Sequence, residues 1–485
     1  MNAMYRDLVK LVGEKERNAW MNWENDRCRP GFHLMPVTGW LNDPNGLCFY
    51  KGYYHVFFQY SPFNANGGVK FWGHYRSNNL TEWEYLGTAI YADQPYDCHG
   101  VYSGSAFIED DTMCLYYTGN VKLLGDYDYV NSGRESNTVL AVSKDGLHFE
   151  NKHCIMTNRD YPPDCTCHVR DPKVWREGDR YYMVQGARKR GDDAENDTGE
   201  VLLFESEDRV NWHFQSRITS EEAFGYMWEC PDFFQLDGVN ILVVCPQGAD
   251  SEEMRYQNLY QCGYYTVDQK ITSQCRLGDF TELDYGFDFY APQTFQDESG
   301  RRIMIGWAGM PDADYENPTA QKENWQHCLT VPRVLEWKHG QICQSPPVEL
   351  QTLRGEKIAE EIAGSFVKKE MSMYELVLFV TQAFEIRIAQ DLMINYNPNE
   401  RKIVLRLMGS LAAGRTSRTV LVDKMEKIHL LVDNSILEIF INDGEKVMTT
   451  RFYPKEIVHE LVIHTNKGNI NLWKLNRMQF RMGEV

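Results

Sequence analysis

One arrangement of polar and hydrophobic positions recurs five times in the first 340 residues of the chain. Each copy has a short polar turn, followed by a strongly apolar or aromatic run that predicts a β-strand. Tyr53 marks the first copy and Ile303 the fifth, and successive markers are 60 to 68 residues apart. The five copies are Lys51–Phe58, Asp110–Tyr117, Gly178–Val184, Asp237–Val244 and Glu298–Ile305.

A second repeated signal lies between these copies. A predicted strand ends in Ser, an acidic or amide residue follows two positions later, and an aromatic residue follows six positions later. The three examples, spaced by 66 and 63 residues, are Ser77–Trp83, Ser143–Phe149 and Ser206–Trp212. Because both signals have a similar period, each unit is expected to contain about four short strands. Five such units in series predict an all-β fold, a five-bladed β-propeller whose sheets surround a central channel.

The pattern changes after two consecutive prolines at 346–347. Runs such as Phe384–Ile388 and Leu437–Ile441 alternate apolar and polar positions, which is typical of half-buried strands and predicts a β-sandwich. At the other end of the chain, Tyr5 and Val12 fall on one face of a predicted helix. The expected divisions are a helical segment at 1–28, the propeller at 29–345, a linker at 346–366 and the sandwich at 367–485.

The chain has 69 acidic and 50 basic residues and a net charge of −19. This charge repels nucleic acids and anionic membranes, so we expect neither as a partner. No apolar run is long enough for a secretory signal or a membrane-spanning helix. The 13 cysteines are irregularly spaced, which favours reduced thiols over a disulfide framework. Cys165, Cys167 and His168 have no second ligand pair at suitable spacing, so no metal is predicted. We therefore expect a cytoplasmic protein.

Three acidic residues occupy similar places in their repeats. Asp43 and Asp171 stand ten residues before the markers of units one and three, and Glu229 stands twelve before that of unit four. The corresponding residues in units two and five are Ser103 and Gln293. Since the innermost strands of a propeller all begin at one end of the channel, we expect the three acids to converge there.

The sequence neighbours of two of these acids predict opposite protonation states. Arg170 is expected to lower the pKa of the Asp171 carboxyl and keep it ionised. Trp228 and Cys230 are expected to raise the pKa of the Glu229 carboxyl, as a general acid requires. Any one of these acids alone is more simply explained as a solvated turn residue, but their shared register favours a site. Two carboxyls in opposed environments suit the hydrolysis of a glycosidic bond.

The motifs around these acids are similar to those of a known family. From about Arg29 to Trp473, the chain resembles glycoside hydrolase family 32, the invertase, fructanase and sucrose-6-phosphate hydrolase family. It looks most like the intracellular sucrose-6-phosphate hydrolase branch. The resemblance implies a five-bladed propeller followed by a β-sandwich, in agreement with the repeat count. The matching motifs are Trp40–Gly46, Tyr102–Ser105, Arg170–Pro172, Trp228–Pro231 and Gly306–Trp307.

The resemblance implies a β-fructofuranosidase that acts on sucrose or sucrose 6-phosphate with retention of configuration. It makes Asp43 the nucleophile, Glu229 the acid/base and Asp171 the stabiliser of the transition state. Arg170 is implied to hold the fructosyl hydroxyls together with Asp171. The other positions that match the fructose pocket are Trp40, Leu41, Asn42, Gln59, Trp72, Tyr102, Ser103 and Trp307. Two features depart from the family pattern: the loop Asn66–Phe71, and Tyr102 where Phe is common.

Other readings of the substrate and partners stay open. A fructan exo-hydrolase or a fructosyltransferase would use the same site, whereas a non-catalytic fructan-binding propeller would be expected to lack one of the acids. No cofactor is implied, because two carboxyls suffice. The sandwich either packs on the propeller, which we favour, or binds carbohydrate or forms a homodimer. Recognition of a phosphorylated sugar would need a local cation, and the candidates are Lys70, Arg188, Lys189, Arg190 and Lys322.

Overall fold

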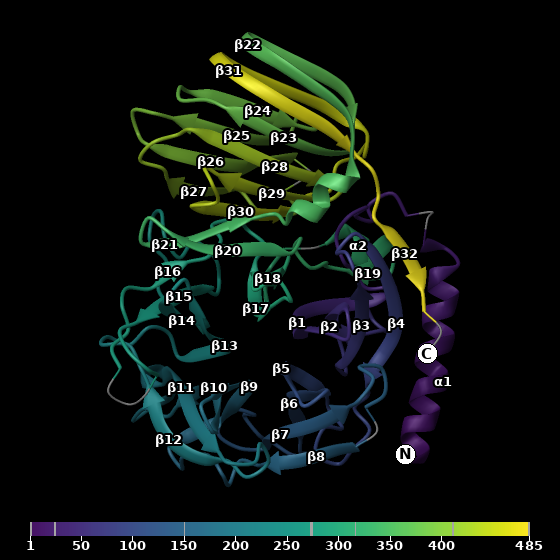
Figure 1. Cartoon of the computed structure of the whole chain (residues 1–485), viewed down its shortest axis with the longest axis vertical. Coiled ribbons are helices and arrows are strands. Elements are labelled where there is room, and N and C mark those ends of the chain that lie inside the picture. Colours follow the sequence, from purple (N-terminus) through teal and green to yellow (C-terminus); the bar gives the residue numbers. More distant parts are fainter. Residues whose placement is uncertain are drawn as a thin grey trace.

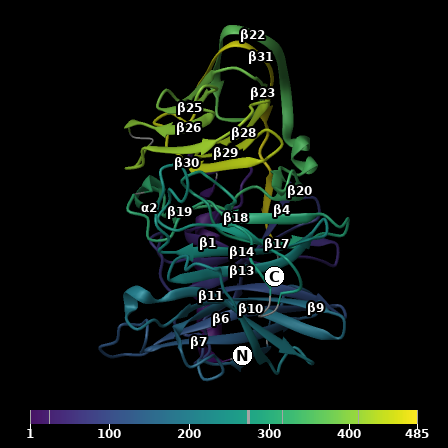
Figure 2. The ribbon, with the colours of Figure 1, turned by 90° about the vertical axis from the view of Figure 1, so that its left-hand side faces the viewer.

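Five sheets, each built on four strands, surround a central axis, and a second all-β domain lies beside them (Figure 1). The computed structural model describes residues 2–23, 26–149, 151–271, 275–315, 317–409 and 412–483. Figure 2 shows the same two domains from the side. The predicted fold class, a five-bladed propeller followed by a β-sandwich, is confirmed.

In every blade the strand nearest the axis comes first in the sequence, and its partners follow antiparallel towards the rim (Figure 1). Blade one contains β1 (Gly39–Tyr50), β2 (Tyr53–Ser61), β3 (Phe71–Ser77) and β4 (Glu82–Ile90), and blade two β5 (Val101–Glu109), β6 (Thr112–Lys122), β7 (Arg134–Ser143) and β8 (Asn151–Met156). Blade three contains β9 (Cys165–Glu177), β10 (Arg180–Lys189), β11 (Thr198–Ser206) and β12 (His213–Ile218). Blade four contains β13 (Met227–Leu236), β14 (Val239–Gln247), β15 (Gly263–Val267) and β16 (Thr281–Glu282). Blade five contains β17 (Tyr290–Gln296), β18 (Arg302–Trp307), β20 (Arg333–Lys338) and β21 (Gln341–Ser345).

The repeated Ser signal forms the turn between the third and fourth strands of blades one to three. In each turn the Ser Oγ accepts a 2.9 Å hydrogen bond from the backbone N–H three residues later. That third residue has a left-handed backbone in every case, and it is Leu80, Gly146 or Arg209. The amide or acid two residues after Ser accepts from the following backbone N–H groups. The repeat is visible in the sequence because this turn is satisfied by side chains close to it in the chain.

Each innermost strand carries one extra residue next to the start of its blade. The register with the second strand shifts between Leu41 and Pro44, Val101 and Gly104, Arg170 and Lys173, Glu229 and Asp232, and Tyr290 and Gln293. A bulge of this kind bends the strand and re-aims its side chains. Within the bulges of blades three to five, the left-handed residues are Asp171, Cys230 and Ala291. The five bulges therefore surround the same end of the channel.

Segments from outside the repeats complete blade one. The two-residue strand β19 (Trp325–Gln326) pairs parallel with β1, and β32 (Gln479–Met482), near the C-terminus, pairs parallel with β4. The helix α1 (Ala3–Trp20) runs along the outside of this blade (Figure 1). It is held there by Glu16, which accepts hydrogen bonds from Tyr85 at 2.7 Å and Thr88 at 3.0 Å. Two short helices among the described residues of the propeller half are η2 (Ala194–Asn196) and α2 (Pro318–Lys322).

The second domain encloses its own hydrophobic core. The long strand β31 (His459–Leu475) joins its two layers, since its first half pairs with β24 and its second half with β23. After η3 (Val348–Leu353), the other strands are β22 (Arg354–Met371), β23 (Met373–Phe379), β24 (Phe384–Ile388), β25 (Leu392–Asn397), β26 (Lys402–Leu407), β27 (Ser417–Leu421), β28 (Lys427–Asp433), β29 (Ile436–Ile441) and β30 (Lys446–Arg451).

The domain limits expected from the sequence differ from these elements in two places. Residues 354–366, expected as part of a linker, belong to β22, which pairs with β31 along much of its length. The last strand, β32, was expected within the sandwich but lies in the propeller sheet of blade one. The chain thus returns to the propeller after completing the second domain.

A buried charged network joins the two domains. Arg333 of blade five donates to Glu438 of the sandwich at 2.5 Å and to Asp284 at 3.1 Å. His33 lies 3.0 Å from Glu438 and 2.7 Å from Asp433. These side chains are fully buried. Buried charges are tolerated only when they are paired and hydrogen-bonded, so this network fixes how the domains meet.

Candidate active site

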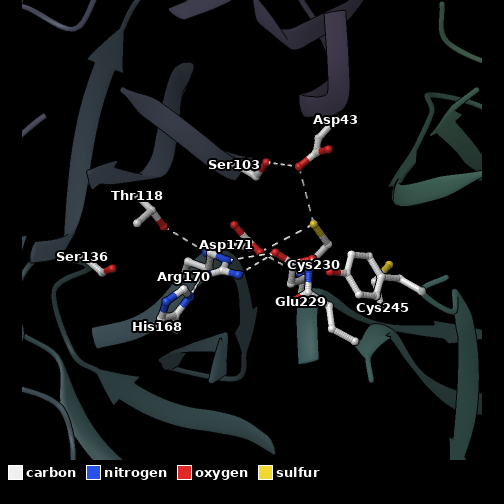
Figure 3. Close-up of polar contacts among 12 residues, drawn as sticks. Asp43, Ser103, Thr118, Ser136, His168, Arg170, Asp171, Glu229, Cys230 and Cys245 are labelled. Atoms are coloured by element: carbon white, nitrogen blue, oxygen red, sulfur yellow. Dashed lines mark hydrogen bonds and ion pairs between the residues drawn. The ribbon is translucent and has the colours of Figure 1, made fainter. Parts of the chain in front are cut away.

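Side chains from three blades meet at the end of the channel where the innermost strands begin (Figure 3). Asp43 comes from β1, Asp171 from β9 and Glu229 from β13. The thiol of Cys230 lies between two of these acids, with Sγ 3.8 Å from Asp43 Oδ2 and 3.5 Å from Asp171 Oδ2. The structure therefore brings together the acids that the repeat register relates.

Asp43 is oriented by hydrogen bonds from neutral side chains that are also linked to one another by hydrogen bonds. Ser103 Oγ donates to its Oδ2 at 2.5 Å, and Asn42 Nδ2 donates to its Oδ1 at 3.0 Å. Asn42 also donates to Gln59, and Gln59 donates to Ser103, at 2.8 and 2.7 Å. Burial raises the pKa of Asp43, while the bonds from Ser103 and Asn42 oppose this rise because they favour the carboxylate.

Asp171 is held by a threonine hydroxyl and a backbone N–H, and not by a hydrogen bond from a cation. Its own N–H donates to Thr118 Oγ1 at 2.9 Å, and its Oδ2 accepts from the N–H of Cys230 at 2.9 Å. Burial raises the pKa of Asp171 to about 7, more than the nearby charge of Arg170 lowers it. The prediction that Arg170 keeps this carboxyl at a low pKa is therefore wrong.

Glu229 is hydrogen-bonded at both carboxylate oxygens. Arg170 donates to Oε1 from Nε at 3.1 Å and from a terminal nitrogen at 2.6 Å. Gln247 Nε2 donates to Oε2 at 2.8 Å, and the Tyr290 hydroxyl donates to the same oxygen at 2.7 Å. Both bonds from Arg170 go to the same oxygen, so the plane of the carboxylate is fixed by these contacts at Oε1 together with those at Oε2. The plane of the Glu229 carboxylate is therefore set by the protein.

The expected apolar environment of Glu229 is wrong as well. The Trp228 ring faces away and stacks on Tyr265, with ring centroids 5.4 Å apart. The Cys230 thiol points towards Asp43 and Asp171 instead (Figure 3). Successive residues of a strand project to opposite faces, so the sequence neighbours of Glu229 are not its neighbours in space.

His168 holds Arg170 from the side opposite Glu229. Arg170 donates from its other terminal nitrogen to His168 Nδ1 at 2.6 Å, and His168 Nε2 lies 3.1 Å from the carbonyl oxygen of Tyr129. A carbonyl only accepts, so Nε2 carries the ring proton and Nδ1 accepts from the guanidinium. Burial lowers the pKa of His168 to about 2, which keeps the ring neutral in this role.

The remaining residues predicted for the fructose pocket fall into two groups. Trp40 is half-buried and donates from Nε1 to Asn42 at 2.8 Å, while Tyr102 is half-buried beside Ser103. Trp72 is fully buried and donates to the carbonyl of Tyr102 at 3.1 Å, so it supports the pocket from behind. Leu41 and Trp307 are also buried.

Leu41 and Trp307 differ in what surrounds them. Leu41 packs into the hydrophobic core of the propeller with no exposed surface, so its side chain does not face the pocket. The Trp307 ring lies 5.9 Å from the ring of Trp40 and 5.0 Å from that of His327. It therefore belongs to an aromatic wall beside the site.

Sequence reasoning missed Tyr290, Gln247, Thr118 and His168. Tyr290 precedes the bulge of blade five just as Glu229 precedes that of blade four, so the bulge register relates these two. Gln293, which the repeat spacing proposed for blade five, lies beyond that bulge. Its amide donates to the carbonyl of Gly104 at 2.7 Å. The repeat markers lie on the second strand of each blade, so counting back from them does not reveal where the innermost strand carries its extra residue. The residue predicted for blade five is therefore displaced.

Comparison with known proteins places the chain in a family. Residues 33–346 match the profile of the glycosyl hydrolases family 32 N-terminal domain, and residues 349–480 match that of the glycosyl hydrolases family 32 C terminal. The chain belongs to glycosyl hydrolase family 32. The resemblance noted in the sequence motifs is thus confirmed over nearly the whole chain.

Several family 32 proteins are similar over almost their full lengths. A sucrose-6-phosphate hydrolase of Bacillus subtilis (strain 168) is 38% identical over 492 residues, covering 98% of this chain and 100% of the relative. A sucrose-6-phosphate hydrolase of Staphylococcus xylosus is 39% identical over 464 residues, covering 92% of this chain and 91% of the relative.

Solved structures of the family share this architecture. The sucrose-6-phosphate hydrolase of Lactobacillus gasseri has a TM-score of 0.87 at 30% identity, covering 96% of this chain and 97% of the other. A family 32 β-fructofuranosidase of Bombyx mori has a TM-score of 0.85 at 30% identity, covering 97% and 99%. Within the described residues, no helix of this family 32 chain is both long and apolar enough to cross a membrane.

Proposed function

We propose that this family 32 chain is a retaining β-fructofuranosidase that hydrolyses sucrose and sucrose 6-phosphate. The observation that carries the proposal is the pair of differently held carboxyls at one end of the channel. Asp43 accepts hydrogen bonds from the neutral side chains of Ser103 and Asn42. Glu229 accepts hydrogen bonds from the Arg170 cation and from the Tyr290 hydroxyl. Two carboxyls with separate supports are the minimum apparatus of a retaining glycosidase.

In the first step, a carboxylate oxygen of Asp43 attacks the anomeric carbon of the fructosyl unit. The bond to the glucosyl oxygen breaks, and Glu229 gives its proton to that oxygen. The hydrogen bonds from Ser103 and Asn42 orient the Asp43 carboxylate before the reaction, so less orientational entropy is lost when the covalent bond forms. The family resemblance assigns Asp171 and Arg170 to the fructosyl hydroxyls, where they stabilise the charge that develops on the ring.

In the second step, Glu229 takes a proton from water, and the resulting hydroxide oxygen displaces Asp43 from the anomeric carbon. Glu229 must therefore exist in two protonation states during each cycle. Tyr290 accommodates both states, because its hydroxyl has a second acceptor, the carbonyl oxygen of Cys245 at 3.3 Å. The hydroxyl can turn to that carbonyl when Oε2 carries a proton.

Two further observations support the substrate and the compartment. The similar proteins from Bacillus subtilis and Staphylococcus xylosus are named sucrose-6-phosphate hydrolases, which favours a phosphorylated disaccharide. No disulfide joins any of the 13 cysteines, all of which lie within the described ranges. Reduced thiols of this number fit the cytoplasm.

The test is a comparison of kcat/KM for sucrose, sucrose 6-phosphate, kestose and inulin with one preparation of the enzyme. The proposal expects efficient release of fructose from the two disaccharides and weaker activity on the longer substrates. Preferential cleavage of inulin would make the chain an exo-hydrolase. Formation of kestose in place of free fructose at high sucrose would make it a fructosyltransferase. Intact substrate in all four assays would contradict the proposal.

A further inference from the structure

The position of Glu229 shows on which side of the site the leaving sugar must lie. This inference rests on the proposed function, in which Glu229 gives its proton to the glucosyl oxygen. The glucosyl unit therefore lies next to Glu229, and a phosphate on its C6 lies near the same carboxyl. A cation that recognises this phosphate must come from the groups around Glu229, and it must not already be paired.

Two of the nearby arginines are already occupied. All three guanidinium nitrogens of Arg170 donate hydrogen bonds to Glu229 or His168. Arg188 lies near His168 but is paired with Asp197 at 2.6 Å, and its guanidinium carbon lies 4.6 Å from the centroid of the Tyr226 ring. Neither is available to an incoming anion without breaking a contact that the protein already makes.

Arg134 is different. It is the first residue of β7, and two residues further along this strand Ser136 donates to the carbonyl of Cys167 on β9 at 2.7 Å. The start of β7 therefore lies beside the segment that carries His168 and Arg170, as Figure 3 shows for Ser136. The charge of Arg134 interacts with those of Arg170 and Glu229.

The guanidinium of Arg134 has no hydrogen-bond or ion-pair partner among the described residues, and its Nε is buried. Burial, and after it the neighbouring Arg170 charge, lower the pKa of Arg134, while the more weakly acting Glu229 carboxylate opposes this. The planar fork of a guanidinium matches the oxygens of a phosphate monoester.

Two cations that the sequence suggested are less suitable. Lys70 places its ammonium 4.7 Å from the centroid of the Trp40 ring and interacts with Asp43, on the side of the nucleophile. Arg190 donates to the side chain of Asn131 at 2.9 Å and to its carbonyl at 3.3 Å. From these contacts we propose that Arg134 binds the 6-phosphate of the leaving glucosyl unit and sets the preference for sucrose 6-phosphate over sucrose.

The test compares Arg134→Gln, Arg134→Lys and the control Arg190→Gln, a similar loss of charge outside the proposed site. For each protein, kcat/KM is measured with sucrose and with sucrose 6-phosphate. Arg134→Gln is expected to lose about 10- to 100-fold on the phosphorylated substrate, as for a lost charge-assisted contact, and to keep its activity on sucrose. Arg134→Lys should recover part of the loss, because it restores the charge without the fork, and Arg190→Gln should match the wild type.

The ratio of the two kcat/KM values is decisive, because a general loss of folded enzyme lowers both equally. An unchanged ratio in Arg134→Gln overturns the proposal, as does a selective loss in Lys70→Gln with none in Arg134→Gln. If the wild type hydrolyses neither sugar, the proposed function fails, and glucose 6-phosphate then serves as the probe. Calorimetric binding of glucose 6-phosphate that Arg134→Gln abolishes would still support the phosphate site, and equal binding by both proteins would refute it.

Discussion

Arg170 donates two hydrogen bonds to Glu229, at 3.1 and 2.6 Å, and none to Asp171, its neighbour in the sequence. The bulge that begins at Arg170 turns these two consecutive side chains in different directions. The cation of the Arg-Asp-Pro motif therefore positions the acid of the next blade. The aspartate of the same motif is left in a buried place, where its pKa rises. Because Arg170 contacts Glu229 and not Asp171, changes around Glu229 should affect catalysis, and the titration of Asp171 should affect stability.

Replacing the acid and the nucleophile should have different consequences. Glu229→Gln removes the proton that the glucosyl oxygen needs, so kcat on sucrose should fall roughly 10²- to 10⁴-fold. A fructoside with a very acidic leaving group, such as an aryl fructoside, needs little protonation, so its first step should survive in this variant. Asp43→Asn removes the attacking oxygen and should abolish turnover of both substrates. Equal losses for both variants on both substrates would mean that the two roles are wrongly assigned.

Tyr290→Phe tests a residue that the sequence did not reveal. The change removes the 2.7 Å hydrogen bond to Glu229 and keeps the aromatic ring in place. A hydrogen bond to a charged group contributes about 1.5–3 kcal/mol, so kcat should fall about tenfold or more. Tyr181→Phe is a matched control, since that hydroxyl donates to the carboxylate of Glu109 at 2.8 Å, at the end of β5 away from the site. The steady-state kcat on sucrose gives the result, and wild-type values in Tyr290→Phe would remove it from the mechanism.

The raised pKa of Asp171 predicts how stability depends on pH. The folded chain keeps the Asp171 proton up to about pH 7, whereas an exposed aspartate loses it near 3.8. Between these values the unfolded chain binds fewer protons, so this group makes the fold less stable as the pH rises. Its stabilising contribution is complete below about pH 4 and is lost as the pH rises through about 7.

Urea unfolding of the wild type and Asp171→Asn at several pH values between 4 and 7 measures this effect. The free energy of unfolding of the wild type, relative to the variant, should fall by up to ~1.4 kcal/mol per pH unit. A difference that stays constant with pH would show that Asp171 is not the group responsible.

The buried network between the domains should dominate the stability of their interface. Arg333→Met leaves Asp284 without its cation and Glu438 with His33 alone, and an uncompensated buried charge costs about 3–5 kcal/mol. Arg401→Met is the control, because its ion pair with Asp423 is exposed and contributes at most ~1 kcal/mol. Thermal unfolding of both variants should show a large loss for the first and almost none for the second. Similar losses would contradict the account of the interface.

The blades could be predicted from the sequence because their signals are local. The Ser-led turns satisfy their own backbone, so Ser77, Ser143 and Ser206 mark the same corner without help from distant residues. The strand β22 could not be predicted in the same way. It pairs only with β31 and is exposed along most of its length, so it carries little of the alternation that reveals a half-buried strand.

The acids of the site could be located from the sequence, but their environments could not. The register placed Asp43, Asp171 and Glu229 at one end of the channel because strand order alone decides it. The partners of Glu229 come from β9, β14 and β17, and no spacing within β13 indicates them. Arg134 likewise has no motif around it, and its unpaired guanidinium is apparent only once the blades are assembled.

The central claim is that Asp43 forms a covalent bond to the fructosyl unit. Attack by Asp43 inverts the anomeric carbon once, and attack by the acceptor inverts it again, so the product keeps the configuration of the substrate. Free fructose mutarotates too quickly to preserve this information, so methanol should be supplied as the acceptor with sucrose and the products followed by NMR. The account predicts methyl β-fructofuranoside, formed in proportion to the methanol supplied. Formation of the α-anomer would contradict it, because Asp43 would then act as a base towards water and not as the nucleophile.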